Sequence, residues 1–251
     1  MKYPGREIKK GETDKKIVTA IQKQLEALGI AKFEGVGVFG PKTEQAVKTF
    51  QARNTDSQGN SLIIDGKVAS ITWEILFGES TVPSLETTRT QGLASVLEIA
   101  AGEIGSMEVP PGSNWGPKVK EYLASAGVTF PAPWCAGFVY WCFDKAAMGL
   151  GKKNPLFRTG GVMMHWNKSE AKKILAKDAT ANPALVKPGH IFIMSFGGGL
   201  GHTGLVESLN GGFINVIEGN TNDNGSREGI GVFRRVRKIN SINKGFLEYK
   251  L

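Results

Sequence analysis

A cysteine, a histidine and a carboxylate are the side chains of this sequence whose types and spacing could carry out chemistry. Cys135 follows the segment Pro131-Ala132-Pro133 and stands in the first turn of a helix expected over residues 134–148. The unpaired backbone N–H groups at a helix start stabilise a thiolate, which is the nucleophilic form of cysteine. Cys135 is therefore a candidate nucleophile, provided that a base lies near it.

The second cysteine, Cys142, has a different interpretation. It lies seven residues after Cys135, which is about 10.5 Å along a helix and too far for a disulfide bond. Its neighbours are apolar, so we interpret Cys142 as a small buried core residue. The two cysteines lack the spacing of a zinc site, and the sequence has no acidic loop suited to calcium. Since acyl transfer by a thiol needs no added group, we expect neither a metal nor a cofactor.

His202 is the histidine best placed to act as the base. It lies between the glycine-rich segment 197–201 and the start of an expected strand. The sequence Asn210-Gly211-Gly212 is a hairpin signal, and it predicts that this strand pairs antiparallel with a strand at 213–218. Paired positions then sum to about 421–423, which places His202 opposite one of residues 219–221.

Two residues near that position could hold the imidazole by its second nitrogen. Asn220 lies within the window and Glu218 is beside it, and both project from one face of the strand because they are two residues apart. The sequence does not choose between them. A helix-start thiol, this histidine and either partner form the activated-thiol arrangement that serves acyl transfer. The other two histidines, His165 and His190, are interpreted as structural residues.

The elements around these residues change from helices to strands along the chain. Apolar residues recur at helical spacing over residues 93–104 and 114–124, ahead of the helix with Cys135. Short β-rich segments separated by glycine and asparagine turns follow. They are expected at residues 191–196, 203–209, 213–218 and 231–236. Helices followed by strands predict an α+β domain.

The first part of the chain predicts a small bundle of three helices, over residues 17–28, 41–54 and 70–77. Its large aromatic residues are expected in the core rather than on a ligand platform, because aromatics at helical spacing usually pack inside. These are Phe39, Phe50 and Trp73. The polar residues of this region form no catalytic arrangement. It is interpreted as a binding module.

A polar segment with a proline separates the two regions, which is typical of a linker. We therefore predict a three-helix domain at residues 1–80, a linker at 81–91 and the α+β domain at 92–251. The chain of 251 residues has 31 basic and 23 acidic side chains and a net charge of +8. This charge favours a polyanionic partner such as nucleic acid, an acidic membrane face or an anionic cell wall, without choosing among them.

Other sequence features bear on location and partners. The sequence has no run of about 18 apolar residues and no apolar stretch after the N-terminal charges, so we expect synthesis in the cytoplasm without a signal peptide and no membrane insertion. The basic segment 233–238 alternates with apolar residues. This alternation favours an edge strand with a basic outer face over a nucleic-acid site. We expect a monomer.

Two family resemblances become specific at this point. Residues 14–78 resemble the three-helix peptidoglycan-binding domain, through Ile21-Gln22-x-x-Leu25-x-x-Leu28-Gly29, Gly37-x-Phe39-Gly40-x-x-Thr43-x-x-Ala46-Val47-x-x-Phe50-Gln51 and Asp65-Gly66-x-Val68-x-x-x-Thr72-Trp73. Residues 92–237 resemble the CHAP family of cysteine amidohydrolases and peptidases, through Pro133-Trp134-Cys135-Ala136-x-Phe138-Val139, Gly201-His202-x-Gly204-x-Val206-Glu207 and Glu218-Gly219-Asn220.

The second resemblance implies a papain-like fold in which Cys135 attacks, His202 is base and then acid, and Glu218 with Asn220 orients the histidine. The sequence departs from the family at His190, where an aspartate is frequent. Together the resemblances imply a peptidoglycan hydrolase that cleaves an amide, either between muramic acid and L-alanine or within the stem peptide or cross-bridge. Release from the cytoplasm or delivery would bring it to the wall, as in a phage lysin.

Two alternatives remain open from the sequence. The first is a non-catalytic wall-binding or assembly protein that keeps the fold, and the presence of Cys135, His202 and Glu218 together argues against it. The second is a thiol-dependent amide transferase. The sequence has no nucleotide-binding loop, which argues against an ATP-driven form of that reaction.

Overall fold

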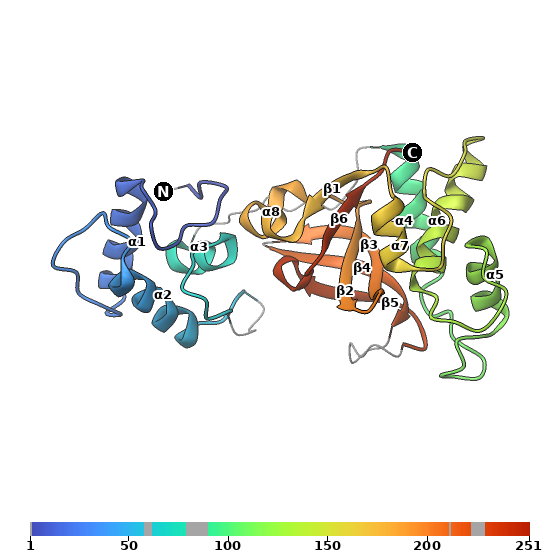
Figure 1. Ribbon diagram of the computed structural model, residues 1–251, viewed down its shortest axis with the longest axis horizontal. Helices are drawn as coiled ribbons and strands as arrows, with labels where there is room; N and C mark the ends of the chain where they lie inside the picture. The colour runs from blue at the N-terminus through green and yellow to red at the C-terminus, as the bar shows by residue number, and fades with distance from the viewer. Residues whose placement is uncertain (1, 58–61, 79–89, 211, 222–228) are drawn as a thin grey trace. The chain divides into compact units, whose positions relative to one another are not determined.

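The computed structural model of the chain describes residues 2–57, 62–78, 90–210, 212–221 and 229–251. The chain divides into two compact units (Figure 1). The described residues up to 78, together with 180–184, belong to the first, and the others belong to the second. The expected linker at 81–91 lies outside the described residues, except that Thr90 caps helix α4 and Gln91 begins it.

The first unit contains the three expected helices, which are confirmed as α1 (Lys15–Ala27), α2 (Pro41–Arg53) and α3 (Ser70–Phe77). Helix α1 begins where the Asp14 carboxylate accepts from two backbone N–H groups, and α2 begins at a proline, which suits the first helical position. The expectation for the aromatic residues is also confirmed. At most 2% of the surface of Phe39, Phe50 and Trp73 is exposed, and all three lie in the core of this unit.

Two buried glutamines connect the helices of the first unit to its loops. The Gln51 side chain on α2 accepts hydrogen bonds from the backbone N–H of Asp65 (3.1 Å) and Gly66 (2.9 Å), and its nitrogen donates to the Lys67 carbonyl (2.9 Å). Gln22 on α1 accepts from the Gly37 N–H at 2.7 Å in the same manner. These motif residues therefore have a structural function, because they satisfy the polar groups of loops that no regular element pairs.

This arrangement predicts the effect of removing one amide. Gln51→Ala is expected to lower the free energy of unfolding of the first unit by roughly 2–3 kcal/mol, because several buried backbone groups lose their partner. Gln45→Ala, at an exposed position of the same helix, should change it by less than about 0.5 kcal/mol. Urea unfolding of residues 1–80, whose one tryptophan is Trp73, followed by fluorescence, measures both. Equal effects of the two substitutions would contradict this role of Gln51.

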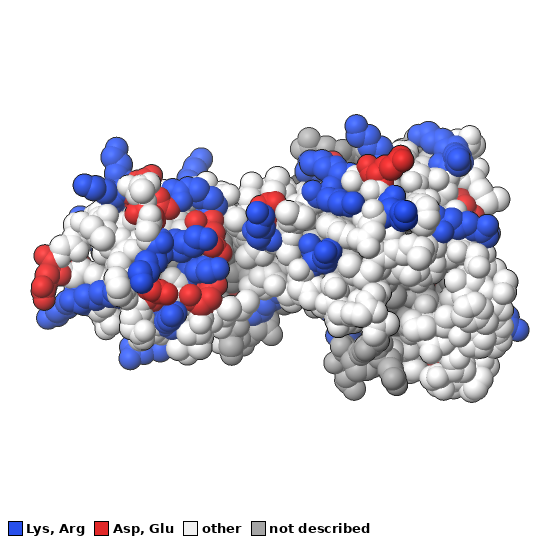
Figure 2. All heavy atoms as spheres, viewed as in Figure 1, with Lys and Arg blue, Asp and Glu red and all other residues white. Residues whose placement is uncertain are grey.

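The second unit is an α+β domain with a six-stranded antiparallel sheet, in the order β1-β6-β2-β3-β4-β5. The four expected strands are confirmed and extend beyond their predicted bounds. The strands are β1 (Lys172–Leu175), β2 (Ile191–Gly197), β3 (Leu200–Asn210), β4 (Phe213–Thr221), β5 (Gly231–Lys238) and β6 (Gly245–Glu248). On the face drawn in Figure 2, basic side chains gather over the region that Figure 1 labels β1 and β6.

The central helix of this unit, α6 (Cys135–Gly149), packs against β3 and β4. Helices α4 (Gln91–Gly102) and α5 (Pro117–Ser125) cover its other side, and α7 (Val162–Lys168) lies against β2 and β3. The short helix α8 (Ala176–Ala181) follows β1. Cys142 on α6 is fully buried among apolar residues, which confirms its interpretation as a core residue.

Three sequence expectations need correction. The helix expected from residue 114 begins at Pro117, because Asn114 (φ 52°) and Gly116 (φ 134°) have backbone conformations that a helix cannot contain. The helix expected to reach residue 104 ends at Gly102. Strands β1 and β6 were not predicted, because segments of four residues carry too little alternation to be recognised.

Candidate active site

Cys135 lies in the first turn of α6, as the sequence predicts; it is the first residue of the helix, and 4% of its surface is exposed. The preceding residue, Trp134, is the N-cap, and its carbonyl accepts the first helical hydrogen bond, from the Phe138 N–H (2.8 Å). No side chain caps this helix start. The thiol therefore lies beside backbone N–H groups that carry the partial positive charge of a helix N-terminus.

Side chains from two distant segments hold Trp134 in place. Its indole Nε1–H donates to the buried carboxylate of Glu108 at 2.8 Å, and the other oxygen of Glu108 accepts from the Asn114 backbone N–H at 3.0 Å. With the amide orientation that satisfies both of its polar atoms, Asn220 accepts from the Trp134 backbone N–H (3.2 Å) and donates to the Gly229 carbonyl (2.9 Å). The position of Cys135, the candidate nucleophile, therefore depends on Glu108 and Asn220.

The hairpin register that the sequence predicts is confirmed. Leu205 pairs with Ile217, Val206 with Val216, and a shift at residue 207 changes the sum of paired positions from 422 to 423. The register brings the His202 imidazole to the Glu218 carboxylate, with 2.8 Å between Nε2 and Oε2. Nδ1 is the ring nitrogen that Glu218 leaves free, and Cys135 lies close enough to the imidazole to raise its pKa.

Glycine residues allow these groups to approach. A Cβ atom at Gly204 would lie 2.8 Å from the Glu218 Cγ, and one at Gly219 would lie 2.7 Å from Trp134 and from Phe138. Real Cβ contacts are longer than this. Only glycine at these motif positions lets β3 approach the Glu218 side chain and lets β4 approach the start of α6.

The structure brings together Cys135, His202 and Glu218, whereas Asn220 bonds elsewhere. Among the contacts of the described residues, the imidazole of His202 meets Glu218 and not Asn220. In this geometry the Glu218 carboxylate faces the histidine, and the Asn220 amide holds the residue before Cys135.

Arg237 on β5 is a residue of this cluster that the sequence analysis missed. Its guanidinium donates through Nε to Oε1 of Glu218 and through Nη2 to Oε2 at 2.8 Å. It also lies over the ring of Phe192, with 5.4 Å between Cζ and the ring centroid. The expected edge strand is confirmed, since β5 ends the sheet, but Arg237 of this basic segment meets the buried Glu218 and so does not belong to a basic outer face.

The charges of the cluster shift two pKa values. Burial lowers the pKa of His202, but the hydrogen bonds to Cys135 and Glu218 and their negative charge outweigh burial and raise it to about 9. Burial raises the pKa of Glu218, but Arg237 and His202 outweigh it and lower the pKa to about 2. Both shifts favour the ionised forms, an imidazolium beside a carboxylate.

The other two histidines lie in structural networks. His165 Nε2 is 2.9 Å from the hydroxyl of Tyr249, and burial lowers the pKa of His165 to about 4. His190 accepts from the Lys187 backbone N–H at 3.2 Å, and burial lowers its pKa to about 4. Neither of the two meets a nucleophile in these contacts. Among the residues that the structure describes, no group of three or more histidine, cysteine or acidic side chains is arranged to hold a metal ion.

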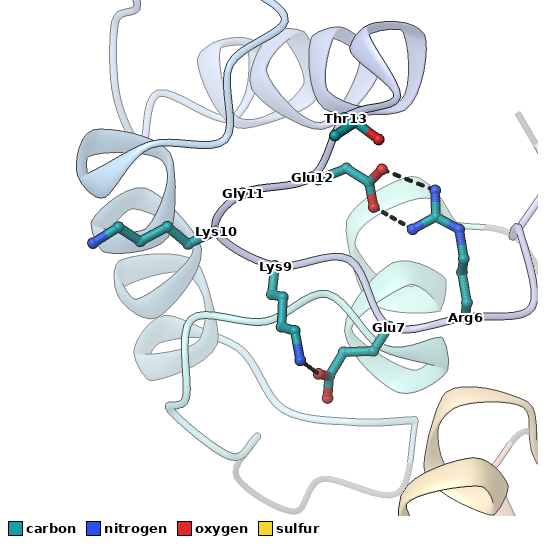
Figure 3. A pocket seen from close by; sticks show the side chains of 7 residues that line it. All are labelled: Arg6, Glu7, Lys9, Lys10, Gly11, Glu12 and Thr13. Carbon is teal, nitrogen blue, oxygen red and sulfur yellow. Dashed lines mark hydrogen bonds and ion pairs between the residues drawn. The ribbon is translucent and has the colours of Figure 1, made fainter.

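A pocket of about 340 Å³ lies in the first unit and is lined by the segment 6–13 (Figure 3). In Figure 3 Arg6 pairs with Glu12 and Lys9 pairs with Glu7, while Lys10 points away from them. The lining contains no cysteine or histidine. This pocket therefore offers none of the groups that activated-thiol chemistry needs, and the site at the start of α6 is the candidate active site.

Across the described ranges, none of the helices combines the length and apolar character needed to cross a bilayer.

Comparison with known families agrees with this architecture. Residues 127–220 match the CHAP domain, and residues 14–76 match a peptidoglycan binding domain. Both matches fall where the sequence motifs placed the two resemblances, and the CHAP match contains Cys135, His202, Glu218 and Asn220. No curated protein and no solved structure gave a significant match to the chain.

Proposed function

We propose that this chain, in which a CHAP domain follows a peptidoglycan-binding domain, hydrolyses an amide bond of peptidoglycan through the thiolate of Cys135. The two domains by themselves support a hydrolase that acts on the cell wall, with peptidoglycan as its partner. The observation that carries the finer proposal is the contact of the helix-start thiol with His202, whose Nε2 meets the buried carboxylate of Glu218.

The proposed reaction has two halves. The Cys135 thiolate attacks the amide carbonyl carbon, and the backbone N–H groups at the start of α6 stabilise the negative oxygen that forms. The carbon–nitrogen bond then breaks, and the His202 imidazolium gives its proton to the leaving amine. In the second half His202 takes a proton from water and the hydroxide attacks the thioester carbon. The carbon–sulfur bond breaks, a carboxylic acid leaves, and the Cys135 thiolate and the His202 imidazolium are restored.

Glu218 and Asn220 have separate roles in this proposal. Glu218 holds the imidazole by Nε2 and so directs Nδ1 toward the sulfur and stabilises the imidazolium. Asn220 is a positioning residue, because it holds the backbone of Trp134, the residue before the nucleophile. The bond cleaved is either that between muramic acid and L-alanine or one within the stem peptide or cross-bridge. The proposed place of action is the wall, in the periplasm or outside the cell.

Product analysis tests this function. Incubating the protein with purified peptidoglycan should release free amino groups without new reducing sugar ends, and mass spectrometry of the soluble products should identify the bond. Prior alkylation of the protein with iodoacetamide should stop the release, because Cys142 is fully buried and Cys135 is the thiol at the helix start. New reducing ends, which mark cleavage of the glycan, would contradict the proposal.

The first domain is proposed to hold the enzyme on its substrate. Residues 1–80 alone are expected to sediment with purified sacculi without cutting them. Residues 92–251 are expected to cut soluble fragments nearly as fast as the whole chain but to lose about tenfold or more on intact sacculi, because tethering raises the local substrate concentration. Sedimentation and turbidity assays at about 0.15 M salt, where distant charges are screened, measure both. If residues 1–80 stay in solution, the first domain does not bind the wall.

A further inference from the structure

The carboxylate of Glu218 has an environment that the proposed mechanism leaves unexplained. It is fully buried, and two cationic groups from neighbouring strands share its oxygens. His202 of β3 meets Oε2, while Arg237 of β5 meets both oxygens in the bidentate geometry that fixes the plane of a carboxylate. The Arg237 side chain is only 16% exposed, so this pair is not an ordinary surface ion pair.

Burial makes such a carboxylate vulnerable to protonation. A carboxylate removed from water tends to take up a proton unless positive charges or hydrogen-bond donors hold it in the ionised form. The charged and titratable groups that face Glu218 are His202 and Arg237, and the thiol of Cys135 on α6 reaches it through the imidazole. A guanidinium keeps its charge throughout the pH range of enzyme activity, whereas the imidazole loses its proton during each turnover.

We propose that Arg237 is a positioning residue that holds Glu218 ionised and correctly oriented for His202 at every stage of the reaction. The imidazole is neutral after it has protonated the leaving amine, and at that stage Arg237 is the only one of the two cations that remains. This inference rests on the proposed roles of Cys135 and His202. It adds a fourth member to the cluster and predicts how that member protects the enzyme from acid.

Burial and the two cations around Glu218 determine the direction in which removal of Arg237 changes its pKa. In the intact protein the bonds to Arg237 and His202 keep the pKa of Glu218 at about 2, so Glu218 stays ionised under ordinary assay conditions. Without Arg237 the burial remains and the bidentate hydrogen bonds that compensate for it are lost, so the pKa of Glu218 rises. Below that raised pKa the imidazolium loses its carboxylate, and the acid limb of the activity profile moves to higher pH.

Three variants of the full chain separate position from charge. Arg237→Gln removes the charge, Arg237→Lys keeps a charge but not the bidentate geometry, and Arg234→Gln is the matched control. Arg234 lies on the same strand and pairs with Glu207, but its side chain is 52% exposed. Thermal unfolding shows which variants fold, and Arg237→Lys carries the test if Arg237→Gln does not.

The first readout does not depend on activity. In ¹³C NMR with labelled glutamate, the Glu218 carboxyl, assigned by its loss in Glu218→Gln, should not titrate above about pH 4 in the intact chain or in Arg234→Gln. It should titrate there in Arg237→Gln, and Arg237→Lys should lie between. A flat Glu218 signal in folded Arg237→Gln overturns the proposal. If Arg237→Gln does not fold, a Glu218 titration in Arg237→Lys that is identical to that of the intact chain overturns the proposal.

The second readout is kcat/KM as a function of pH on a soluble peptidoglycan fragment. Arg237→Gln should move the acid limb upward by about one unit or more and lower the neutral-pH value about 10- to 100-fold, while Arg234→Gln keeps the original profile. An unchanged acid limb in Arg237→Gln overturns the proposal. If the intact chain releases no amino groups, the proposed function fails, and the NMR titration still decides the role of Arg237.

Discussion

Replacing Cys135 with alanine is expected to lower the rate of peptidoglycan hydrolysis by at least about 10³-fold, because the proposed thioester forms on its sulfur. The fold should be kept, since the side chain stands at the start of α6 and removing one sulfur there opens little core volume. Binding to sacculi should also be kept, because the proposed wall-binding residues belong to the first domain. Turbidity loss of purified walls, with circular dichroism as a check on folding, measures this.

Cys142→Ala is the matched control for this prediction. The same substitution seven residues further along α6 truncates a fully buried side chain, which should cost roughly 1–2 kcal/mol of stability while activity is retained at low temperature. The burial of the Cys142 thiol also raises its pKa well above the usual value, so it is a poor nucleophile. If wall hydrolysis survives in Cys135→Ala and disappears in folded Cys142→Ala, Cys142 is the nucleophile and Cys135 is not.

The second large effect is expected at His202. His202→Ala should lower the hydrolysis rate about as much as loss of the thiol, because in the proposed mechanism the imidazole assists the attack of Cys135 and protonates the leaving amine. Glu218→Gln should keep part of the activity, since an amide oxygen can still accept from Nε2. The loss of activity in Glu218→Gln should nevertheless be marked, because this substitution leaves the charge of Arg237 without its carboxylate.

His165→Ala provides the control for the histidine. His165 is a buried histidine that bonds to Tyr249 rather than to a nucleophile, so its loss should lower the melting temperature and leave the rate per folded molecule close to that of the intact chain. Initial rates at a temperature below all the unfolding transitions make the comparison. A silent His165→Ala beside an active His202→Ala would show that the wrong histidine was assigned.

The hairpin was predictable because its register depends on local information. A two-residue turn signal fixes which positions face each other, and Leu205 and Ile217 pair as that arithmetic requires. The same arithmetic brought His202 near both Glu218 and Asn220 but could not choose between them. The choice depends on the start of α6, which approaches β4 at Gly219 and engages the Asn220 amide. That contact joins segments far apart in the sequence.

Arg237 and Glu108 could not be predicted for physical reasons. In β5 an alternating pattern shows which residues share a face, but it does not show whether a long side chain reaches across a neighbouring strand. The observed register pairs Phe233 with Glu218, which puts Arg237 on the same face as Glu218. Only the register of β4 with β5 could have identified Arg237 as a neighbour of Glu218. Glu108 lies in an irregular segment without periodicity, so nothing in the sequence marks its contact with Trp134.

The strand order has a consequence for how the protein is made. β6, the last strand along the sequence, lies inside the sheet between β1 and β2, and β1 joins the sheet only through it. A ribosome must therefore translate past β6 before this strand can pair with both β1 and β2. Such non-local pairing is slow and leaves no smaller part of the domain with a finished sheet. We expect nascent chains that end before β6 to be devoid of lytic activity, so that the wall-cutting function arises only after translation of this domain.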